Sequence, residues 1–248
     1  MRKAFSKLHR YLVTSRVAKY RIFVWADTVA IPDDGTFTFA RDDDFLFGLL
    51  HSRLHEVWAL AQGTQLREKE SGFRYTPTTC FETFPFPRPT PAQESAIAAA
   101  AKELNELRER WLNPPEWTVE RILEFPGSAD GPWSRYLVNP DKNGIGTVHY
   151  PRLQPREPDC AAKLKKRTLT ELYNKRQRGD GDAVWLDFAH KKLDAAVASA
   201  YGWPADLSDE QILERLLALN LERAAEEQQA SKVMKPKTSR EKRPEEML

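Results

Sequence analysis

The spacing of hydrophobic residues changes along this chain, and that change limits the possible fold more than any other feature. Residues 9–25 are rich in β-branched and aromatic residues, and residues 36–40 alternate polar and apolar side chains after a Pro-Asp-Asp-Gly turn at 32–35. Four later segments repeat apolar residues at helical spacing. They are residues 45–62, 91–112, 184–201 and 209–224. The sequence therefore predicts an α+β fold, with a small β-rich region followed by a mainly helical one.

Local signals mark the ends of these helices. Asp44 is the predicted N-cap of the first helix, and Gly63 is placed to stop it. A proline pair at 114–115 ends the second helix, because the residue before a proline disfavours helical torsion angles. Ser208 and Gln211 form a capping box that starts the fourth helix.

Other segments lack helical periodicity. Residues 81–87 contain two prolines and three phenylalanines, and they are expected to be extended and anchored to a core. Residues 117–123 are expected to add another helical turn or two. Residues 125–183 are expected to form a long loop-rich insertion. The predicted division is residues 1–90, residues 91–225 and a disordered tail at residues 226–248.

The charge distribution indicates a partner with a phosphate backbone. The net charge of the 248 residues is only +2, but residues 1–21 carry seven Lys/Arg and no Asp/Glu. Residues 152–178 carry nine Lys/Arg against three acids. Such asymmetry favours nucleic acid as the partner. A solvated charged surface is the alternative that charge alone leaves open.

The same composition argues against a membrane or secreted protein. The apolar runs are far shorter than the roughly 20 residues that cross a bilayer, and no apolar segment of a secretory signal follows the basic start. Cys80 and Cys160 lie far apart, which suits neither a disulfide framework nor a zinc ribbon. We expect a cytoplasmic protein.

Several separated segments, in order, resemble one family. The segments are RYLVTSRVAKYRIFVW (10–25), FGLLHSRLHEVWAL (47–60), RYTPTTCFETFPFP (74–87), LTELYN (169–174) and residues 185–224. They are similar to the C-terminal part of the MmeI-like enzymes, which are single-chain type II restriction-modification proteins related to adenine methyltransferases of phage-defence systems. The resemblance implies the end of a DNA target-recognition domain at about 1–90 and a C-terminal helical domain after it.

The catalytic half of such an enzyme is not recognisable in this sequence. The family binds S-adenosyl-L-methionine (SAM) at a Gly-rich turn, but Gly144-Ile145-Gly146 has no expected helix behind it. The adenine-binding loop needs an aromatic residue after Asn/Asp-Pro-Pro, whereas Asn113-Pro114-Pro115 is followed by Glu116. We therefore expect no catalytic residues and no cofactor in this chain alone. SAM is expected in a missing methyltransferase half, which is either encoded separately or lost.

Double-stranded DNA is the partner that the resemblance implies, and six residues are candidates to bind it. They are Thr14, Ser15, Arg16, Lys19, Arg21 and Arg53. Arginine can make bidentate contacts to guanine or phosphate, and hydroxyls can donate to phosphate. Two alternatives stay open: the basic residues of the first strands pair with the acidic cluster at 42–44, and Arg53 pairs with Glu56. A weaker hypothesis adds nonspecific phosphate contacts from Lys163, Lys165, Lys166, Arg167, Lys175 and Arg176.

Competing interpretations remain at this stage. His51 and His55 have the spacing of two metal ligands on one helix, but no third ligand is evident, and we expect no metal site. The chain could also be a protein-protein docking module, which an exposed apolar face on the helix at 45–62 would favour. A third possibility is an inactive remnant of a truncated gene.

Overall fold

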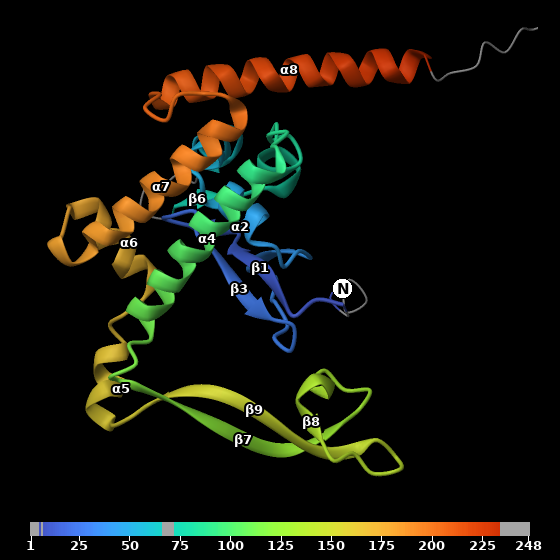
Figure 1. Cartoon of the computed structure of the whole chain (residues 1–248), viewed down its shortest axis with the longest axis vertical. Helices are drawn as coiled ribbons and strands as arrows, with labels where there is room; N and C mark the ends of the chain where they lie inside the picture. Colours follow the sequence, from blue (N-terminus) through green and yellow to red (C-terminus); the bar gives the residue numbers. More distant parts are fainter. Residues whose placement is uncertain (1–4, 6, 66–71, 234–248) are drawn as a thin grey trace, which may run out of the picture.

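The structure of the chain is a computed structural model that describes residues 5, 7–65 and 72–233. It has the expected α+β class, with small sheets near the N-terminus and helices after them (Figure 1). The first sheet has the order β3-β1-β4 and is antiparallel. Its strands are β1 (Arg10–Ser15), β3 (Phe23–Asp27) and β4 (Thr36–Phe39). Because β3 and β4 both pair with β1, the turn at 32–35 joins the two edges of this sheet.

A second, smaller sheet continues directly from the first. It has the order β2-β6-β5 and consists of two-residue strands. They are β2 (Val17–Ala18), β5 (Thr64–Gln65) and β6 (Phe73–Arg74). Only Arg16 separates β1 from β2, so this residue lies where the two sheets meet.

The expected single helix over 45–62 is in fact two helices, α2 (Asp44–His51) and α3 (Arg53–Gln62). Ser52 breaks it with an extended backbone, and its hydroxyl accepts a hydrogen bond from the N–H of His55. The apolar spacing of three and four residues continues across this break, so it does not reveal the change of direction. The N-cap of α2 is Asp43 rather than Asp44, because the Asp43 carboxylate accepts from the N–H of Leu46 at 2.8 Å.

Two of the predicted helices have the expected bounds. They are α4 (Pro91–Leu112) and α7 (Val184–Tyr201). Thr90 caps α4 through a capping box, and Gly202 ends α7 in the left-handed conformation that glycine tolerates. Before α4 the chain makes one π-helical turn, η2 (Pro77–Phe81), which includes the start of the segment at 81–87 that was expected to be extended. Residues 82–84 continue as a turn and a bend, and the chain lacks helical or turn structure only from residue 85 up to the start of α4. Helices α2, α4 and α7 pack against one another.

The largest departure from expectation is a long two-stranded β-ribbon. Strands β7 (Thr118–Ser128) and β9 (Ile145–Pro155) pair along their whole length, where helical turns and a loop-rich insertion were expected. Strand β8 (Leu137–Val138) adds a short third strand beside β9. Figure 1 shows the ribbon set apart from the helices. The ribbon is followed by the helices α5 (Pro158–Leu164) and α6 (Leu169–Arg178).

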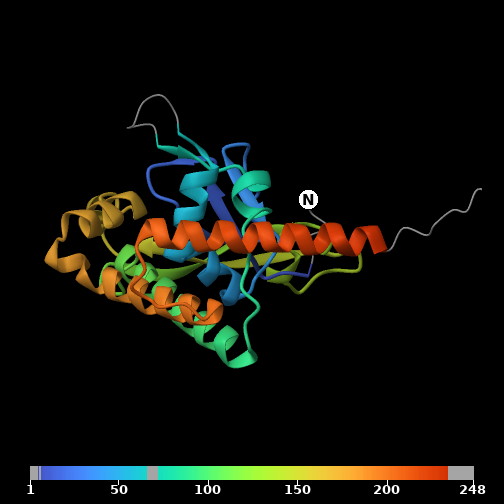
Figure 2. The same cartoon turned by 90° about the horizontal axis from the view of Figure 1, so that it is seen from above.

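The last helix is longer than predicted. Helix α8 (Asp209–Val233) begins at the predicted capping box, in which the Ser208 N–H donates to Gln211 Oε1 at 2.9 Å. It then continues nine residues beyond 224, and its far end extends past the other helices (Figure 2). The disordered tail expected from residue 226 is therefore helical up to Val233. Residues 234–248 lie outside the described part of the chain.

A single hydrophobic core spans both predicted domains. It includes Leu12, Phe23 and Phe47 from the first 90 residues and Leu104 and Leu193 from the later helices. The boundary at residue 90 stays a prediction, but no separate core supports either side of it in the described residues. None of the described helices is both long and apolar enough to cross a bilayer.

Candidate nucleic-acid interface

Three exposed basic side chains gather where the two small sheets meet. They are Arg16, Lys19 and Arg74, which we call the basic edge. Arg74 pairs with Val17 across β2 and β6, and Arg16 directly precedes β2. The guanidinium carbon of Arg16 lies 5.0 Å from the centre of the Phe37 ring. Within the described residues, none of the three forms an ion pair, so their charges are free to meet an anion.

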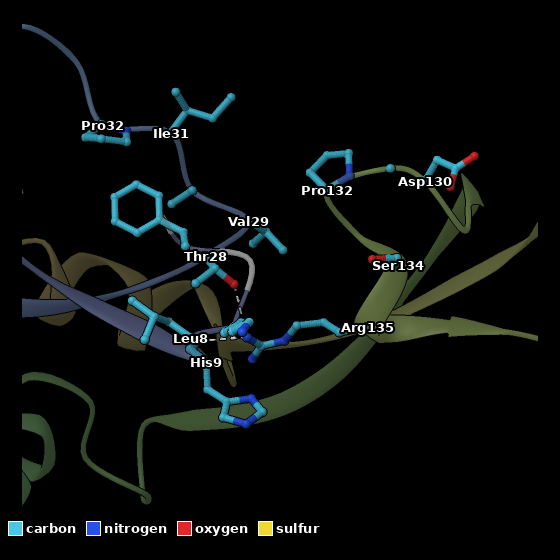
Figure 3. A pocket seen from close by; sticks show the side chains of 14 residues that line it. Leu8, His9, Thr28, Val29, Ile31, Pro32, Asp130, Pro132, Ser134 and Arg135 are labelled. Atoms are coloured by element: carbon cyan, nitrogen blue, oxygen red, sulfur yellow. Dashed lines mark hydrogen bonds between the residues drawn. The ribbon is translucent and has the colours of Figure 1, made fainter. Parts of the chain in front are cut away.

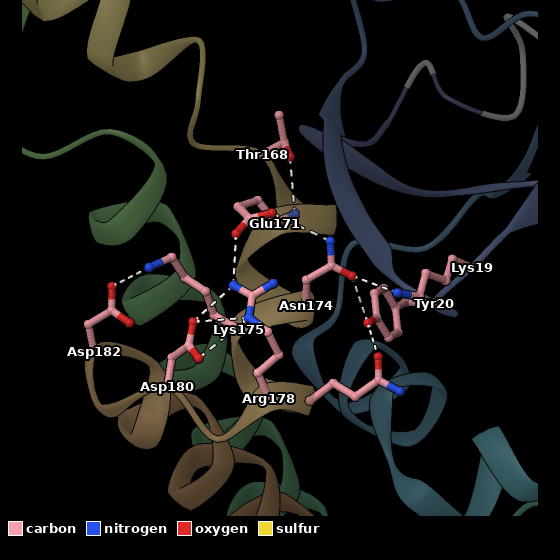
Figure 4. Close-up of polar contacts among 10 residues, drawn as sticks. Lys19, Tyr20, Thr168, Glu171, Asn174, Lys175, Arg178, Asp180 and Asp182 are labelled. Carbon is pink, nitrogen blue, oxygen red and sulfur yellow. Dashed lines mark hydrogen bonds and ion pairs between the residues drawn. The ribbon is translucent and has the colours of Figure 1, made fainter. Parts of the chain in front are cut away.

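Helix α6 holds the Lys19 end of the basic edge in place. The Lys19 ammonium donates to Asn174 Oδ1 at 2.7 Å, and the Tyr20 hydroxyl lies 2.9 Å from the same oxygen (Figure 4). Gln177 Oε1 is 2.7 Å from the Tyr20 hydroxyl. These partners are uncharged amides, so they orient Lys19 without neutralising it.

Thr14 and Arg21, two of the predicted DNA-binding residues, are buried. The Arg21 guanidinium donates to Thr14 Oγ1 at 3.0 Å and to the carbonyl of Phe73 at 3.0 Å, and it also contacts the carbonyl of Ser15. Burial lowers the pKa of Arg21 to about 10, which still leaves it charged at neutral pH. Arg21 therefore joins β1 to β6 from inside and supports the backbone on which Arg16 lies. Ser15 remains exposed beside Arg16.

Arg53 is occupied by contacts between helices. Its guanidinium pairs with Asp209 at 2.7 Å and donates to the carbonyl of Leu207 at 3.0 Å. Its backbone N–H donates to Asp194 at 2.7 Å. Arg53 thus ties the start of α3 to α7 and to the start of α8, and its side chain pairs with Asp209 rather than with Glu56. Burial raises the pKa of Asp194 to about 6.

The acidic cluster at 42–44 has partners other than the basic edge. Asp44 pairs with Arg10 at 2.9 Å, and Asp43 pairs with Arg41 at 2.7 Å. The alternative in which this cluster neutralises Arg16, Lys19 and Arg21 is therefore not what the structure shows.

The two histidines of α2 and α3 are part of a buried polar network. His51 Nε2 lies 2.9 Å from an Nη of Arg108, whose other Nη donates to the carbonyl of Phe23 at 3.0 Å. His55 contacts the Tyr75 hydroxyl at 3.1 Å and the carbonyl of Leu50 at 3.0 Å. Burial lowers the pKa of both histidines, that of His55 to about 3. The described residues contain no cluster of three metal-ligating side chains.

Most of the basic residues at 163–176 are paired within the fold. Lys163 pairs with Asp159, Lys175 with Asp182 and Arg176 with Asp187. Arg167 donates to the carbonyl of Trp111 and lies over the rings of Trp111 and Trp117. Lys165 and Lys166 are exposed, and neither forms an ion pair in the described part of the chain. Of the six residues proposed to make nonspecific phosphate contacts, only these two lysines remain candidates.

The first comparison with known proteins concerns the N-terminal part of the chain. Residues 6–88 match the family model described as "MmeI, target recognition domain". This match covers about a third of the chain. The matched residues, which we call the target recognition domain after that model, comprise both small sheets, helices α2 and α3, and the whole basic edge.

Two individual proteins are similar over longer stretches. DNA methyltransferase A of Bacillus subtilis (strain 168) is 26% identical over 175 residues, which are 71% of this chain and 13% of that protein. A solved structure of the type IIL restriction-modification enzyme MmeI in complex with DNA matches with a TM-score of 0.54 and 20% identity. That match covers 88% of this chain and 22% of the MmeI chain, and it supports the fold. The chain thus spans less than a quarter of the length of either relative.

A pocket of about 670 Å³ lies between the target recognition domain and the tip of the ribbon (Figure 3). Val29 and Ile31 line one side, and Pro132 and Arg135 line the other. Arg135 crosses between the two sides, where it donates to the carbonyl of His9 at 2.7 Å and to Thr28 Oγ1 at 3.2 Å. The ribbon tip is therefore attached to the target recognition domain.

Two basic residues, one on the basic edge and one at the pocket, were not singled out from the sequence. Arg74 was quoted in a family segment but given no role, although an exposed basic residue next to the buried Phe73 is the alternation expected of a strand. Arg135 lies in the segment expected to be a loop. No signal in the sequence marks it, because its partners in the target recognition domain, His9 and Thr28, are more than 100 positions away.

Proposed function

We propose that the target recognition domain binds double-stranded DNA and contributes sequence recognition to an adenine-specific methyltransferase of a restriction-modification system. The observation that carries the proposal is the basic edge, which lies inside the matched residues 6–88 and has three exposed cations without acidic partners among the residues that the structure describes. Phosphate contacts supply most of the affinity of DNA-binding proteins, and base contacts supply their specificity.

The three side chains suit different contacts. Arg16 is exposed and carries the planar fork of donors that fits guanine O6 and N7 or two phosphate oxygens. Lys19 is a point charge already oriented by Asn174, which suits a phosphate. Ser15 can donate its hydroxyl to phosphate beside Arg16. Thr14 and Arg21 contribute by positioning this segment, since their polar atoms are bonded inside the fold.

Methyl transfer is assigned to a part outside residues 1–248. The relatives are a DNA methyltransferase and a restriction-modification enzyme, and this chain matches 13% and 22% of their lengths. In this proposal the missing part binds SAM and the flipped adenine, while the chain described above sets which sequence is engaged.

Protein docking is a second candidate, supported by a different surface from the one expected. The apolar residues Leu46, Leu50 and Leu54 of α2 and α3 are buried, so these helices offer no broad apolar face. On α8, Leu217 and Leu221 are 45% and 61% exposed and lie four residues apart on one face. A methyltransferase part can pack there without excluding DNA binding.

Binding to mixed-sequence duplex DNA across a salt series tests the proposal. Each phosphate contact steepens the dependence of log K on log salt by about 0.9 for B-DNA. We expect wild-type binding to weaken with salt, and the variant Arg16→Gln/Lys19→Gln/Arg74→Gln to lose most of this dependence. Absence of binding by the folded chain at low salt would overturn the proposal. Lys102→Gln/Lys191→Gln/Lys192→Gln removes the same charge from α4 and α7 as a control.

A further inference from the structure

Two arginines face each other across the ribbon without an acidic partner. Arg121 of β7 is directly opposite Arg152 of β9, and both side chains are exposed. Like charges at directly opposed strand positions destabilise a sheet. Neither arginine forms an ion pair in the part of the chain that the structure describes. Repulsion between the two arginines therefore destabilises the ribbon locally, and a bound anion would relieve this repulsion.

The positions next to these arginines on the same face do not neutralise them. Strand alternation and the register place Val119, Leu123, Gln154 and Tyr150 around the pair on this face. All four are uncharged. The acids of β7, Glu120 and Glu124, point to the opposite face, where Glu124 lies 3.4 Å from His149.

The ribbon is fixed relative to the target recognition domain. On the arginine-bearing face, Phe125 and Tyr150 pack against Trp133, with ring centres 5.1 and 4.9 Å apart respectively. Next to them, the Tyr136 hydroxyl donates to Asp27 of β3 at 2.6 Å. These contacts therefore fix the position of the ribbon relative to the domain.

More unpaired positive charge lies at the base of the ribbon. Helix α5 packs against β9, and Lys165 and Lys166 follow it, both exposed. Arg156, one residue after β9, donates to the carbonyl of Pro115 and has no acidic partner among the described residues. Positive charge thus continues from the arginine pair to the start of the helical region.

We propose that this face of the ribbon, centred on Arg121 and Arg152, is a second DNA-contacting surface that binds the phosphate backbone. The inference rests on the proposed DNA binding of the target recognition domain and adds a contact outside residues 6–88. Each strand has 11 residues, so the ribbon is about 36 Å long. That is close to one turn of B-DNA. The side chains of directly opposed residues start only about 5 Å apart, so both guanidinium groups can reach a single phosphate group.

The test compares charge-removing variants of the 248-residue chain in the same salt series. Arg121→Gln/Arg152→Gln is expected to reduce the salt slope by about 0.9, the value for losing contact with the one phosphate group that the two arginines share. The control Arg88→Gln/Arg215→Gln removes the same charge from exposed arginines away from the ribbon and is expected to leave the slope unchanged. Thermal unfolding should show equal or higher stability for Arg121→Gln/Arg152→Gln, because a repulsive pair is removed.

The outcomes separate this inference from the proposed function. An unchanged slope in the ribbon variant, together with a reduced slope in the basic-edge variant, overturns the ribbon contact and leaves the domain's DNA binding intact. An equal reduction in the ribbon variant and in the Arg88/Arg215 control overturns it too, because net charge alone then explains the effect. No binding by the folded wild-type chain overturns both.

Discussion

Arg108 of α4 and His51 of α2 meet at 2.9 Å in the interior, where Arg108 is only 1% exposed. No carboxylate hydrogen-bonds to this guanidinium in the described residues, and its Nε has no hydrogen-bond partner there. The guanidinium group instead contacts the Phe23 carbonyl, the His51 ring and the nearby Phe47 ring. This contact joins the first sheet, α2 and α4 at one point.

Loss of Arg108 is therefore expected to be severe. Arg108→Ala leaves a cavity and removes the donors to His51 and to the Phe23 carbonyl, so we expect the free energy of unfolding to fall by about 3 kcal/mol or more. Arg110→Ala, two residues along the same helix but exposed, should change it by less than about 0.5 kcal/mol. Urea titration of both variants measures the difference. Similar effects from both would show that Arg108 is not a structural centre.

Stability is expected to fall with acid because histidines are buried in the neutral form. The folded-state pKa of His55 is about 3, whereas the unfolded value is about 6.5, so only the unfolded chain binds this proton between those pH values. Each such group lowers stability by about 1.4 kcal/mol per pH unit in that window. Asp194, whose pKa is raised to about 6, opposes this trend because the folded state binds its proton first.

The contribution of His55 can be isolated by comparing slopes. His55→Gln should be less stable than wild type at pH 7, because the contacts to Tyr75 and Leu50 change. Between pH 6 and pH 4 the free energy of unfolding of the variant should nevertheless fall less steeply with decreasing pH than that of wild type. The difference in slope should correspond to the uptake of about one proton fewer on unfolding. Denaturant titrations at several pH values measure the two slopes. Parallel curves would mean that His55 titrates normally in the folded chain.

Gly48 is expected to reject even a methyl group. A Cβ at this position of α2 would lie 2.8 Å from Ile97 Cγ2 and 2.9 Å from Ala101 Cβ, both on α4. Gly48→Ala should therefore cost about 1–3 kcal/mol by overpacking, although alanine favours helices over glycine. Gly181→Ala, which meets nothing within 4 Å, is the matched control and should be nearly neutral. A more stable Gly48→Ala would mean that α2 and α4 are packed less closely than described.

The attachment of the ribbon tip depends on Asp27. This carboxylate accepts from the Tyr136 hydroxyl at 2.6 Å and pairs with Arg135 at 3.3 Å. In Asp27→Asn we expect faster hydrogen exchange in residues 129–138, because two charge-assisted contacts are weakened. Exchange in α4 and α7 should stay at the wild-type rate. Unchanged exchange at the tip would show that aromatic packing alone holds it.

Helix bounds were predictable wherever the chain carries its own stop signals. Helix α4 begins at Pro91 after a Thr90 cap, and α7 ends before Gly202, so local chemistry fixes these ends. The break at Ser52 was missed because an apolar face can continue through a change of helix direction. Its hydroxyl cap is only recognisable once the backbone there is known to be extended.

The ribbon was missed for a different reason. Two strands that pair mainly with each other bury little, so β7 and β9 lack the strong alternation of a packed strand, and Ile122 and Leu153 are about half exposed. Pro126, Pro151 and Pro155 within the strands also argued against pairing. For the candidate interface, Arg16 and Lys19 were singled out from the sequence and are exposed, but the burial of Arg21 depends on Phe73, 52 positions away.

The shared core limits how specificity can be exchanged between related chains. A graft of residues 6–88 alone would carry His51 and Gly48 without the α4 side chains that complement them, Arg108 and Ile97. The recipient would have to supply matching residues at both places, or His51 would lose its arginine contact and the crossing of α2 with the next helix would pack poorly. Recombination that preserves folding should therefore transfer α4 together with the sheets, or else change only surface side chains such as Arg16 and Arg74.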